Sequence, residues 1–282
     1  MKKITRRSFM AAAGLTVAAL ALTACGGSSS TASSAAASSV ASSAAASSEA
    51  ASAAATELTT VEAGKLTMAT NAAFPPYEMT TDAGEFEGID IETAQAIADK
   101  LGLELQIDDM DFDAALLSVQ QGKADIVMAG VTVTDERKAV MDFSDSYATG
   151  IQSIIVPEGS DIASPDDLAG KKIGTQRGTT GYIYCSDDFG DENVVAYDDG
   201  LTAVQALNNG QVDAVVIDNA PAQEFIAANP GLKILDTSYA EEDYAIGMAK
   251  GSSLEDAINA ALEELKADGT LQSIVDKYIT AE

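Results

Sequence analysis

The residues best suited to bind a small charged molecule lie where expected strands end. Arg137 closes the run Gly130-Val131-Thr132-Val133-Thr134-Asp135-Glu136-Arg137, in which a strand ends and a helix begins. A guanidinium can hold a carboxylate through two parallel hydrogen bonds, and the free N–H groups at a helix start also attract anions. Asp218 follows the apolar run 214–217 and could pair with an ammonium group, and Gly178-Thr179-Thr180-Gly181 is a second amide-rich loop. Together these groups could hold both charges of one zwitterion.

Each of these residues also has a simpler interpretation. Arg137 alone could be a surface charge on a helix, and Asp218 could be the N-cap of a helix that starts near Pro221. The Gly-Thr-Thr-Gly turn is a common loop. Their joint placement favours binding, because ligands of open α/β sheets bind beyond the carboxyl ends of the strands.

The elements that must position these groups follow from an alternation of short apolar runs and helical patterns after Lys65, which is typical of an α/β fold. The helix that begins near Ile91 should end at Gly102, a usual residue just after a helix. Strands are expected at 66–70, 103–107, 124–129, 172–175 and 214–217, and helices at 91–101, 113–121, 135–141 and 201–207.

An internal repeat predicts two lobes of similar build. The segment 119–130 parallels the segment 207–218, which begins 88 residues later. Each reads as a helix end, a glycine turn, an aspartate and a buried strand. If the lobes face each other, the strand ends near Asn71, Thr132, Gln176 and Asp218 line one cleft.

The amino terminus reads as an export signal followed by a lipid anchor. Basic residues among the first seven precede an apolar stretch from Ala11 to Ala24, which is too short to span a membrane. Leu22-Thr23-Ala24-Cys25 resembles the lipobox of bacterial lipoproteins, which predicts a signal peptide over 1–24 and lipidation of Cys25. An ordinary signal peptide with a chance cysteine is the alternative. Thr5-Arg6-Arg7-Ser8-Phe9 also resembles a twin-arginine signal, so the export route stays open.

The Ser/Ala-rich segment after Cys25 cannot bury enough apolar surface to fold alone. Residues 25–63 are therefore predicted to be a disordered tether between the lipid and the folded part.

Composition excludes several classes of function. The net charge of −28 argues against a nucleic-acid surface and against a highly anionic ligand. The chain contains no histidine, which excludes a His-based catalytic triad or zinc site. With Cys25 committed to lipid, Cys185 is a lone thiol, so no disulfide is expected. We expect no cofactor and no metal.

Residues 64–282 resemble the periplasmic and lipoprotein amino-acid-binding proteins of ABC importers, the polar-amino-acid group of extracellular solute-binding protein family 3. The resemblance implies an α/β, two-lobed, type II periplasmic-binding-protein-like fold, in which each lobe is a mixed sheet flanked by helices. It implies lobes at 64–146 plus 245–282 and at 152–239, with two hinge strands near 147–151 and 240–244. The matching stretches are Ala69-Thr70-Asn71-Ala72-Ala73-Phe74-Pro75-Pro76-Tyr77-Glu78, Gly88-Ile89-Asp90-Ile91, Ala129 to Arg137, Asp142-Phe143-Ser144-Asp145-Ser146-Tyr147, the Gly-Thr-Thr-Gly loop and Asp213 to Asp218.

The resemblance also implies roles for individual residues. Arg137 and the amides of Thr132 and Thr180 would hold the ligand carboxylate. Asp218, the Gly130 carbonyl and the Thr132 hydroxyl would hold its ammonium group. The other implied ligand-binding residues are Phe74 and Phe112, which would sandwich the ligand side chain, Tyr77 nearby, Asn71, Asp90 and Gln176 at its tip, and Val131 and Thr179.

Departures from the family pattern concern the ligand's side chain. Relatives often carry Asp at position 71 and some carry Lys at position 176, whereas Asn71 and Gln176 are neutral. A neutral polar side chain is therefore slightly favoured over a cationic one. Asp90 could instead tie a loop together, and Phe74 could be part of the core.

The implied function is binding without catalysis: an extracytoplasmic, lipid-anchored monomer captures a free amino acid by hinge closure and delivers it to an ABC permease and its ATPase. Two other classes use the same fold. A dehydratase would need a general acid above its substrate, and a sensor accessory would pass the ligand signal to a receptor.

Overall fold

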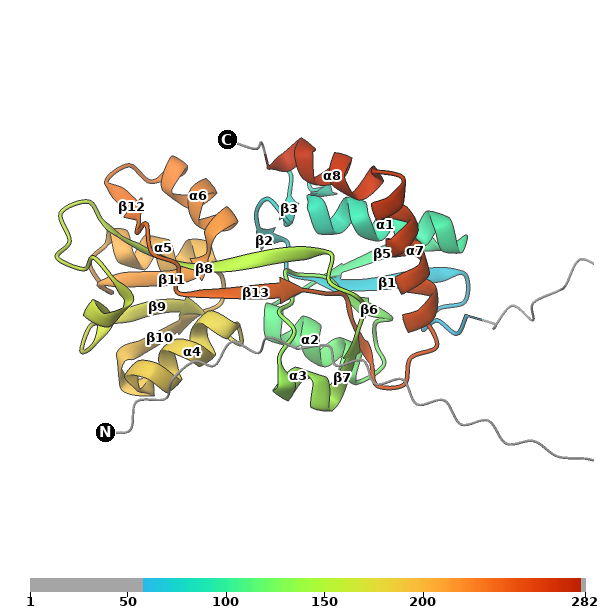
Figure 1. Ribbon diagram of the computed structural model, residues 1–282, viewed down its shortest axis with the longest axis horizontal. Coiled ribbons are helices and arrows are strands. Elements are labelled where there is room, and N and C mark those ends of the chain that lie inside the picture. The colour runs from blue at the N-terminus through green and yellow to red at the C-terminus, as the bar shows by residue number, and fades with distance from the viewer. Residues whose placement is uncertain (1–57, 280–282) are drawn as a thin grey trace, which may run out of the picture. The chain divides into compact units, whose positions relative to one another are not determined.

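The computed structural model describes residues 58–279 of the chain. The predicted signal peptide 1–24, the lipidation site Cys25 and most of the tether lie outside these residues. The described part belongs to one compact unit that starts at Ala54. Within this unit the chain forms two larger sheets, each flanked by helices, which we call the first and second lobes (Figure 1).

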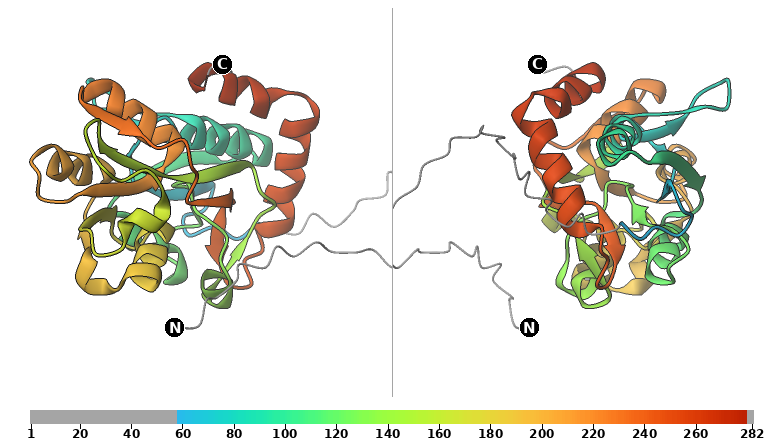
Figure 2. Two further views of the ribbon diagram at one scale, coloured as in Figure 1. Left: turned by 60° about the vertical axis from the view of Figure 1, so that its left-hand side comes forward. Right: turned by 90° about the vertical axis from the view of Figure 1, so that its right-hand side faces the viewer.

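The first lobe is built on a five-stranded mixed sheet. Its strand order is β5-β1-β6-β14-β7, with β1 parallel to β5 and β6 and with β14 antiparallel to β6 and β7. The strands are β1 (Lys65–Thr70), β5 (Glu104–Asp109), β6 (Ile126–Val127), β7 (Met141–Phe143) and β14 (Gly247–Ala249), with a small separate sheet of β2 (Ala73–Phe74), β3 (Glu78–Thr80) and β4 (Phe86–Glu87). The helices are α1 (Ile89–Leu101), α2 (Phe112–Gln120), α3 (Asp135–Val140), α7 (Glu255–Ala267) and α8 (Thr270–Tyr278). Figure 2 shows α7 and α8, in red, along one side of this lobe, where both contact α1.

The second lobe has the same layered build around a six-stranded sheet. Its order is β10-β9-β11-β8-β12, with β13 also paired to β8. The strands are β8 (Ala148–Pro157), β9 (Ile173–Gln176), β10 (Val194–Tyr197), β11 (Ala214–Asp218), β12 (Leu232–Ile234) and β13 (Ala240–Tyr244). The helices are α4 (Thr180–Phe189), α5 (Gly200–Asn208) and α6 (Asn219–Ala228), with short 3₁₀ turns at η1 (Pro165–Leu168) and η2 (Asp191–Asn193).

Two adjacent strands carry the chain between the lobes. β8 leaves the first lobe after β7, and β13 returns to it before β14, so the two run antiparallel between the sheets (Figure 1). Ala148 of β8 is paired with Tyr244 of β13, and Gln152 with Ala240. These strands contain the segments that the resemblance assigns to the hinges.

The predicted internal repeat is present at the level of single hydrogen bonds. In the first lobe α2 is followed by Gly122 at φ 67°, and in the second lobe α5 is followed by Gly210 at φ 68°. The carboxylate of Asp125 accepts a hydrogen bond from Thr67 N at 2.8 Å. The carboxylate of Asp213 accepts one from Lys172 N at the same distance of 2.8 Å. Each aspartate thus ties its own strand to the start of the neighbouring parallel strand.

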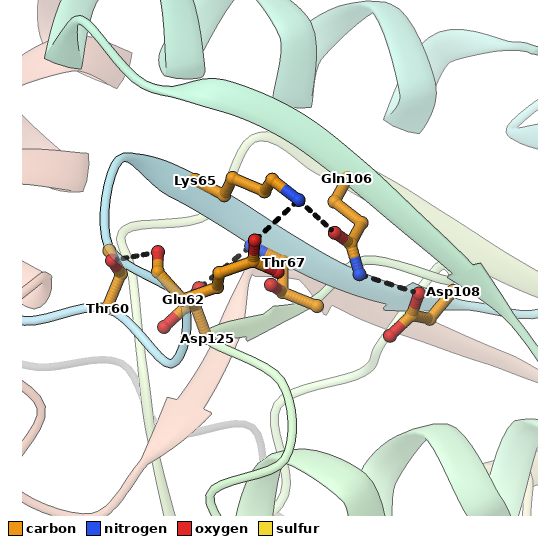
Figure 3. Close-up of polar contacts among 7 residues, drawn as sticks. All are labelled: Thr60, Glu62, Lys65, Thr67, Gln106, Asp108 and Asp125. Carbon is orange, nitrogen blue, oxygen red and sulfur yellow. Dashed lines mark hydrogen bonds and ion pairs between the residues drawn. The ribbon is translucent and has the colours of Figure 1, made fainter.

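Asp125 also holds the beginning of the described chain. Its second carboxylate oxygen accepts from Val61 N at 2.7 Å, and Lys65 lies nearby between Glu62 and Gln106 (Figure 3). Leu58 packs against the core. The folded part therefore reaches back into the segment 25–63 that the sequence assigns to the tether.

Most expected elements are present with shifts of one or two residues at their ends. Helix α1 ends at Gly102 in the left-handed region, where Leu103 N donates to Ala98 O at 2.9 Å. The expected strand 124–129 differs most, because regular pairing is limited to β6. Met128 N still donates to Ala69 O at 3.2 Å, but the chain then turns at Gly130, whose φ is 55°.

Buried aliphatic side chains hold each sheet to its helices. Leu66 and Met68 of β1 pack with Ile97 of α1, and all three are fully buried. Burial of such a side chain contributes about 1.5–3 kcal/mol. Within residues 58–279 no helix is both long enough and apolar enough to cross a membrane.

Candidate functional site

A pocket lies where loops from both lobes meet. Its lining includes residues at or just after the ends of β1, β6, β9 and β11, as expected for ligand sites at the carboxyl ends of strands. The free space at its centre is about 10 Å³, close to the room that one water needs. An amino acid therefore enters only if the lobes separate or the lining side chains move. The lining residues are Asn71, Phe74, Glu78, Phe112, Ala129, Gly130, Thr132 and Arg137 from the first lobe, and Gln176, Thr179, Thr180 and Asp218 from the second.

Arg137 is buried in this pocket and is not a surface charge. It lies in the first turn of α3, where Thr134 caps the helix by accepting from Arg137 N at 3.2 Å. Its side chain is 8% exposed and lies over the Phe112 ring at 5.4 Å from the ring centre. Its guanidinium donates to Thr132 O at 2.7 Å and, in the other lobe, to Gly178 O at 3.2 Å. Burial lowers the pKa of Arg137, but a guanidinium remains charged in proteins.

Asp218 supplies the opposite charge from the second lobe. It occupies the position before α6, but its side chain makes no capping bond within the described residues. Instead its carboxylate accepts hydrogen bonds from Gln152 Nε2 at 2.8 Å and from the Tyr244 hydroxyl. Burial raises the pKa of Asp218 to about 7, and the charge of Glu242 adds to this effect. The carboxylate is thus held in place without serving as a helix cap.

The loop after β9 brings the start of α4 to the same place. Gly178 has φ 76°, a conformation that glycine adopts easily. Thr179 caps α4 by accepting from Tyr182 N at 3.3 Å. Thr180 begins α4, and its hydroxyl lies 3.4 Å from that of Thr132 in the other lobe. The first turn of α4, with its N–H groups, therefore lies beside the loop that precedes α3.

Asn71 and Gln176 bond to each other across the cleft. Gln176 Nε2 donates to Asn71 Oδ1 at 2.8 Å, and Asn71 Nδ2 donates to Met110 O at 3.0 Å. Both side chains are buried. Phe74 and Phe112 also line the pocket and are 7% and 6% exposed.

Three of the predicted ligand-binding residues do not line this pocket. Val131 belongs to a core cluster of the first lobe. Tyr77 stacks on Phe74 with ring centres 6.0 Å apart and borders a neighbouring cavity of about 280 Å³ beside β8. Asp90 is fully buried and accepts from Gly130 N at 3.0 Å, which agrees with the structural role that the sequence left open. Burial raises the pKa of Asp90 to about 6.

Sequence reasoning missed four residues of this region. Ala129 and Glu78 line the pocket, and Gln152 and Glu242 lie behind it. The sequence could have indicated Glu78, because it is the last residue of the matching stretch that begins at Ala69. Glu242 lies in the acidic run Glu241-Glu242-Asp243, which reads as a solvated surface. Only the alternation of side chains along a strand could have predicted that Glu242 points inward.

The Glu78 carboxyl is buried in surroundings that disfavour its charged form. It is fully buried, and within residues 58–279 neither of its oxygens has a hydrogen-bond partner of standard geometry. Burial raises the pKa of Glu78 well above its usual value, and the nearby Asp90 charge raises it further. The Glu78 and Asp90 carboxyl groups therefore lie close together, and the raised pKa of Glu78 favours its protonated form.

Comparison with known proteins gives the family. The model of the bacterial extracellular solute-binding proteins, family 3, matches residues 66–281. The chain belongs to this family. Its fold is accordingly the type II periplasmic-binding fold, as the sequence predicts.

Individual relatives support the same assignment. The L-cystine-binding protein TcyJ of Escherichia coli K12 is 32% identical over 226 residues, which cover 78% of this chain and 85% of that protein. The structure of the arginine-, lysine-, histidine-binding protein ArtJ from Geobacillus stearothermophilus matches with a TM-score of 0.74 and 33% identity, over 77% of this chain and 96% of that one. An ancestral arginine-binding protein bound to glutamine matches with a TM-score of 0.74 and 42% identity, over 78% and 100% of the two chains.

Proposed function

We propose that this protein is the extracytoplasmic solute-binding component of an ABC importer and that it captures a free polar L-amino acid. The observation that carries the proposal is the presence of opposite charges in one buried pocket. Arg137 comes from the first lobe and Asp218 from the second, each 8% exposed. Because an unpaired buried charge is costly, a molecule with both a carboxylate and an ammonium group fits this pocket better than a neutral solute.

The carboxylate end of the ligand has suitable donors. Arg137 has two N–H groups on carbonyl oxygens and keeps further ones for a carboxylate. The first turn of α4 at Thr180 adds backbone N–H groups on the opposite side. A carboxylate between them would join the two lobes. The ammonium group would lie toward Asp218 and the Thr132 hydroxyl.

The side-chain end of the pocket supports a cationic ligand side chain. Asn71 and Gln176 are neutral and favour a neutral partner from sequence alone. Glu78 lines the pocket and Asp90 lies next to Glu78, so two buried carboxyl groups could offset a positive charge on the ligand side chain and reverse that small preference. A guanidinium brings five N–H donors for such acceptors. The relatives named above have ligands that include cystine, arginine, lysine, histidine and glutamine, so the family by itself leaves the side chain open.

Closure of the two lobes is the proposed mechanism. β8 and β13, the strands that connect the lobes, would act as hinges near 147–151 and 240–244. The ligand touches both lobes, so it stabilises the closed form by the difference between its affinities for the closed and open forms. The lobes themselves would be 64–146 plus 245–282 and 152–239.

The proposed surroundings follow from the amino terminus and the family. Residues 1–24 would be removed on export, Cys25 would carry the lipid, and the segment after it would tether the binding unit to the membrane. The unit would work as a monomer and would dock on a permease driven by an ATPase. We propose no catalytic step, since both charged groups at the amino acid's shared end serve binding.

A thermal-shift screen of the standard amino acids tests the proposal. A ligand at about 100 times its dissociation constant adds about 2.7 kcal/mol, which is several degrees for a protein of this size. We expect the largest shift with L-arginine and a smaller one with L-glutamine. Glu78→Gln should reduce the shift with L-arginine more than that with L-glutamine. If no amino acid raises the melting temperature, the proposed function is wrong.

A further inference from the structure

Glu242 makes a buried contact behind the groups proposed to hold the ligand ammonium. It lies on β13, and its side chain is 6% exposed. Its Oε2 accepts from Thr132 Oγ1 at 3.1 Å and from Gln152 Nε2 at 3.0 Å. Gln152, on β8, is 1% exposed and donates from the same nitrogen to Asp218 at 2.8 Å. A buried chain of hydrogen bonds thus links the hydroxyl, both carboxylates and the amide.

The contact with Glu242 decides which way the Thr132 hydroxyl points. A hydroxyl has one proton, and an ionised carboxylate only accepts. The Thr132 proton is therefore directed at Glu242, and its lone pairs are left to accept. An ammonium group is a pure donor and requires such an acceptor. Without Glu242 the hydroxyl could donate toward Asp218 or Thr180 and would present its proton to the ligand.

The amide of Gln152 fixes the orientation of Asp218, the second acceptor proposed for the ligand ammonium group. Its nitrogen must face the two carboxylates, because an amide oxygen there would meet only acceptors. Its two N–H groups bridge Asp218 and Glu242, while the Tyr244 hydroxyl donates to the other oxygen of Asp218. Removal of Glu242 would free one amide hydrogen and loosen the orientation of Asp218.

We propose that Glu242 is a positioning residue for the α-ammonium group of the ligand, acting through the Thr132 hydroxyl and through Gln152. The inference rests on the proposed function, since it requires an amino-acid ligand. Glu242 lies on one of the two strands that connect the lobes, so the ammonium site is coupled directly to that connection. The groups that face it are Arg137 of α3, Asp218 of β11, Tyr184 of α4 and Tyr244 of its own strand.

Calorimetry with a matched pair of ligands tests the role. The pair is L-arginine and 5-guanidinopentanoic acid, which is the same molecule without the α-amino group. Glu242→Gln should weaken L-arginine binding by about tenfold or more, the size expected for a lost hydrogen bond to a charged group. It should change binding of the analogue less than about twofold, since the analogue makes no ammonium contact. Glu241→Gln removes the same charge from the exposed face of β13 and should change neither affinity.

A pH profile provides a second measurement that a purely structural role would not move. The negative charge of Glu242 helps to raise the pKa of Asp218. In Glu242→Gln the fall of L-arginine affinity at low pH should therefore shift to lower pH. Gln152→Met keeps Glu242 but removes the bridge, and it should show the same selective loss of L-arginine if Glu242→Gln does not fold.

The outcomes distinguish a failure of the Glu242 proposal from a failure of the proposed function. Equal weakening of both ligands by Glu242→Gln, or an unchanged pH profile, would show that Glu242 only supports the fold or closure. If L-glutamine proves to be the ligand instead, the same pair of measurements uses L-glutamine and 4-carbamoylbutanoic acid. Failure of the wild-type protein to bind any amino acid rejects the proposed function itself.

Discussion

The two lobes share one structural unit and use it for opposite charges. In each, a helix ends at a glycine with positive φ, and an aspartate then ties the next strand to its parallel neighbour. Asp125 and Asp213 accept from the neighbouring strand at the same distance of 2.8 Å. Up to the start of the strand, the two copies share the conformation of the glycine and the bond from the aspartate to the neighbouring strand.

They diverge where the strand ends. In the first lobe β6 stops at Val127, and the chain turns at Gly130 before α3 brings in Arg137. In the second lobe β11 continues to Asp218, which pairs with Gln152 of β8 and leads directly into α6. One lobe therefore contributes a cation after a loop, and the other an anion at a strand end. A zwitterion held between them would contact both lobes, as the proposed closure around a ligand requires.

The largest expected effect comes from removing either charge. Arg137→Ala and Asp218→Ala should each weaken amino-acid binding by about 3–5 kcal/mol, because the partner charge of the ligand is then buried unpaired. Isothermal calorimetry measures the loss. Arg177→Ala, an exposed arginine in the second lobe, is the control and should bind normally. Tight binding by either pocket variant would mean that the lobes do not divide the two charges in this way.

The structural aspartates should differ in their effect on stability although their positions correspond. Asp125 is buried and accepts from two backbone N–H groups, those of Val61 and Thr67. Asp213 is exposed and accepts from Lys172 N. Asp125→Ala should therefore cost about 2–3 kcal/mol and Asp213→Ala about 1 kcal/mol in urea unfolding. Equal costs would show that burial of the repeat does not matter.

Ligand binding and the stability of the ligand-free protein should respond to pH with opposite signs. The pKa of Asp218 is raised to about 7, so its buried charge destabilises the fold above that pH and its protonation relieves the cost below it. The ligand-free protein should melt at a higher temperature as the pH falls from 8 to about 5.5. Affinity should fall by up to about tenfold per pH unit below 7, because the ammonium needs the ionised form. Asp218→Asn should weaken the pH dependence of stability.

The smallest expected effect is the difference in stability cost between two glycine variants, which should be near zero. Gly122 and Gly210 have φ of 67° and 68°, and a Cβ at either would meet nothing within 4 Å. Replacing each by Ala should therefore cost about 1–2 kcal/mol through backbone strain alone. The two costs, measured by urea unfolding, should agree within about 0.5 kcal/mol. A larger gap would show that the turns are less alike than their dihedral angles.

Much of the fold could be predicted because it depends on local patterns. Apolar runs alternating with helical spacing gave the α/β class, and Gly102 and Gly122 marked helix ends by their conformational freedom. The prediction of a strand over 124–129 was wrong at its end, since burial alone does not distinguish a paired strand from a buried turn.

The pocket was predictable only in part. Arg137 and Asp218 could be found because strand ends in such sheets face ligands. Tyr77 and Val131 do not line the pocket, because the direction of a side chain within a loop depends on what packs against it. The bond between Asn71 and Gln176 joins residues of different lobes and has no local signal.

The sequence by itself determined which chemical groups are present and in what order along the chain. It contains a guanidinium after one glycine loop and a carboxylate after one apolar run, with the same helix–glycine–aspartate unit before each. Only the tertiary structure decided that these groups share one buried pocket, and that Glu242 turns inward while Glu241 stays in solvent. The reason is physical: composition and spacing set local conformation, whereas burial and charge pairing arise from segments that meet only when both sheets are formed.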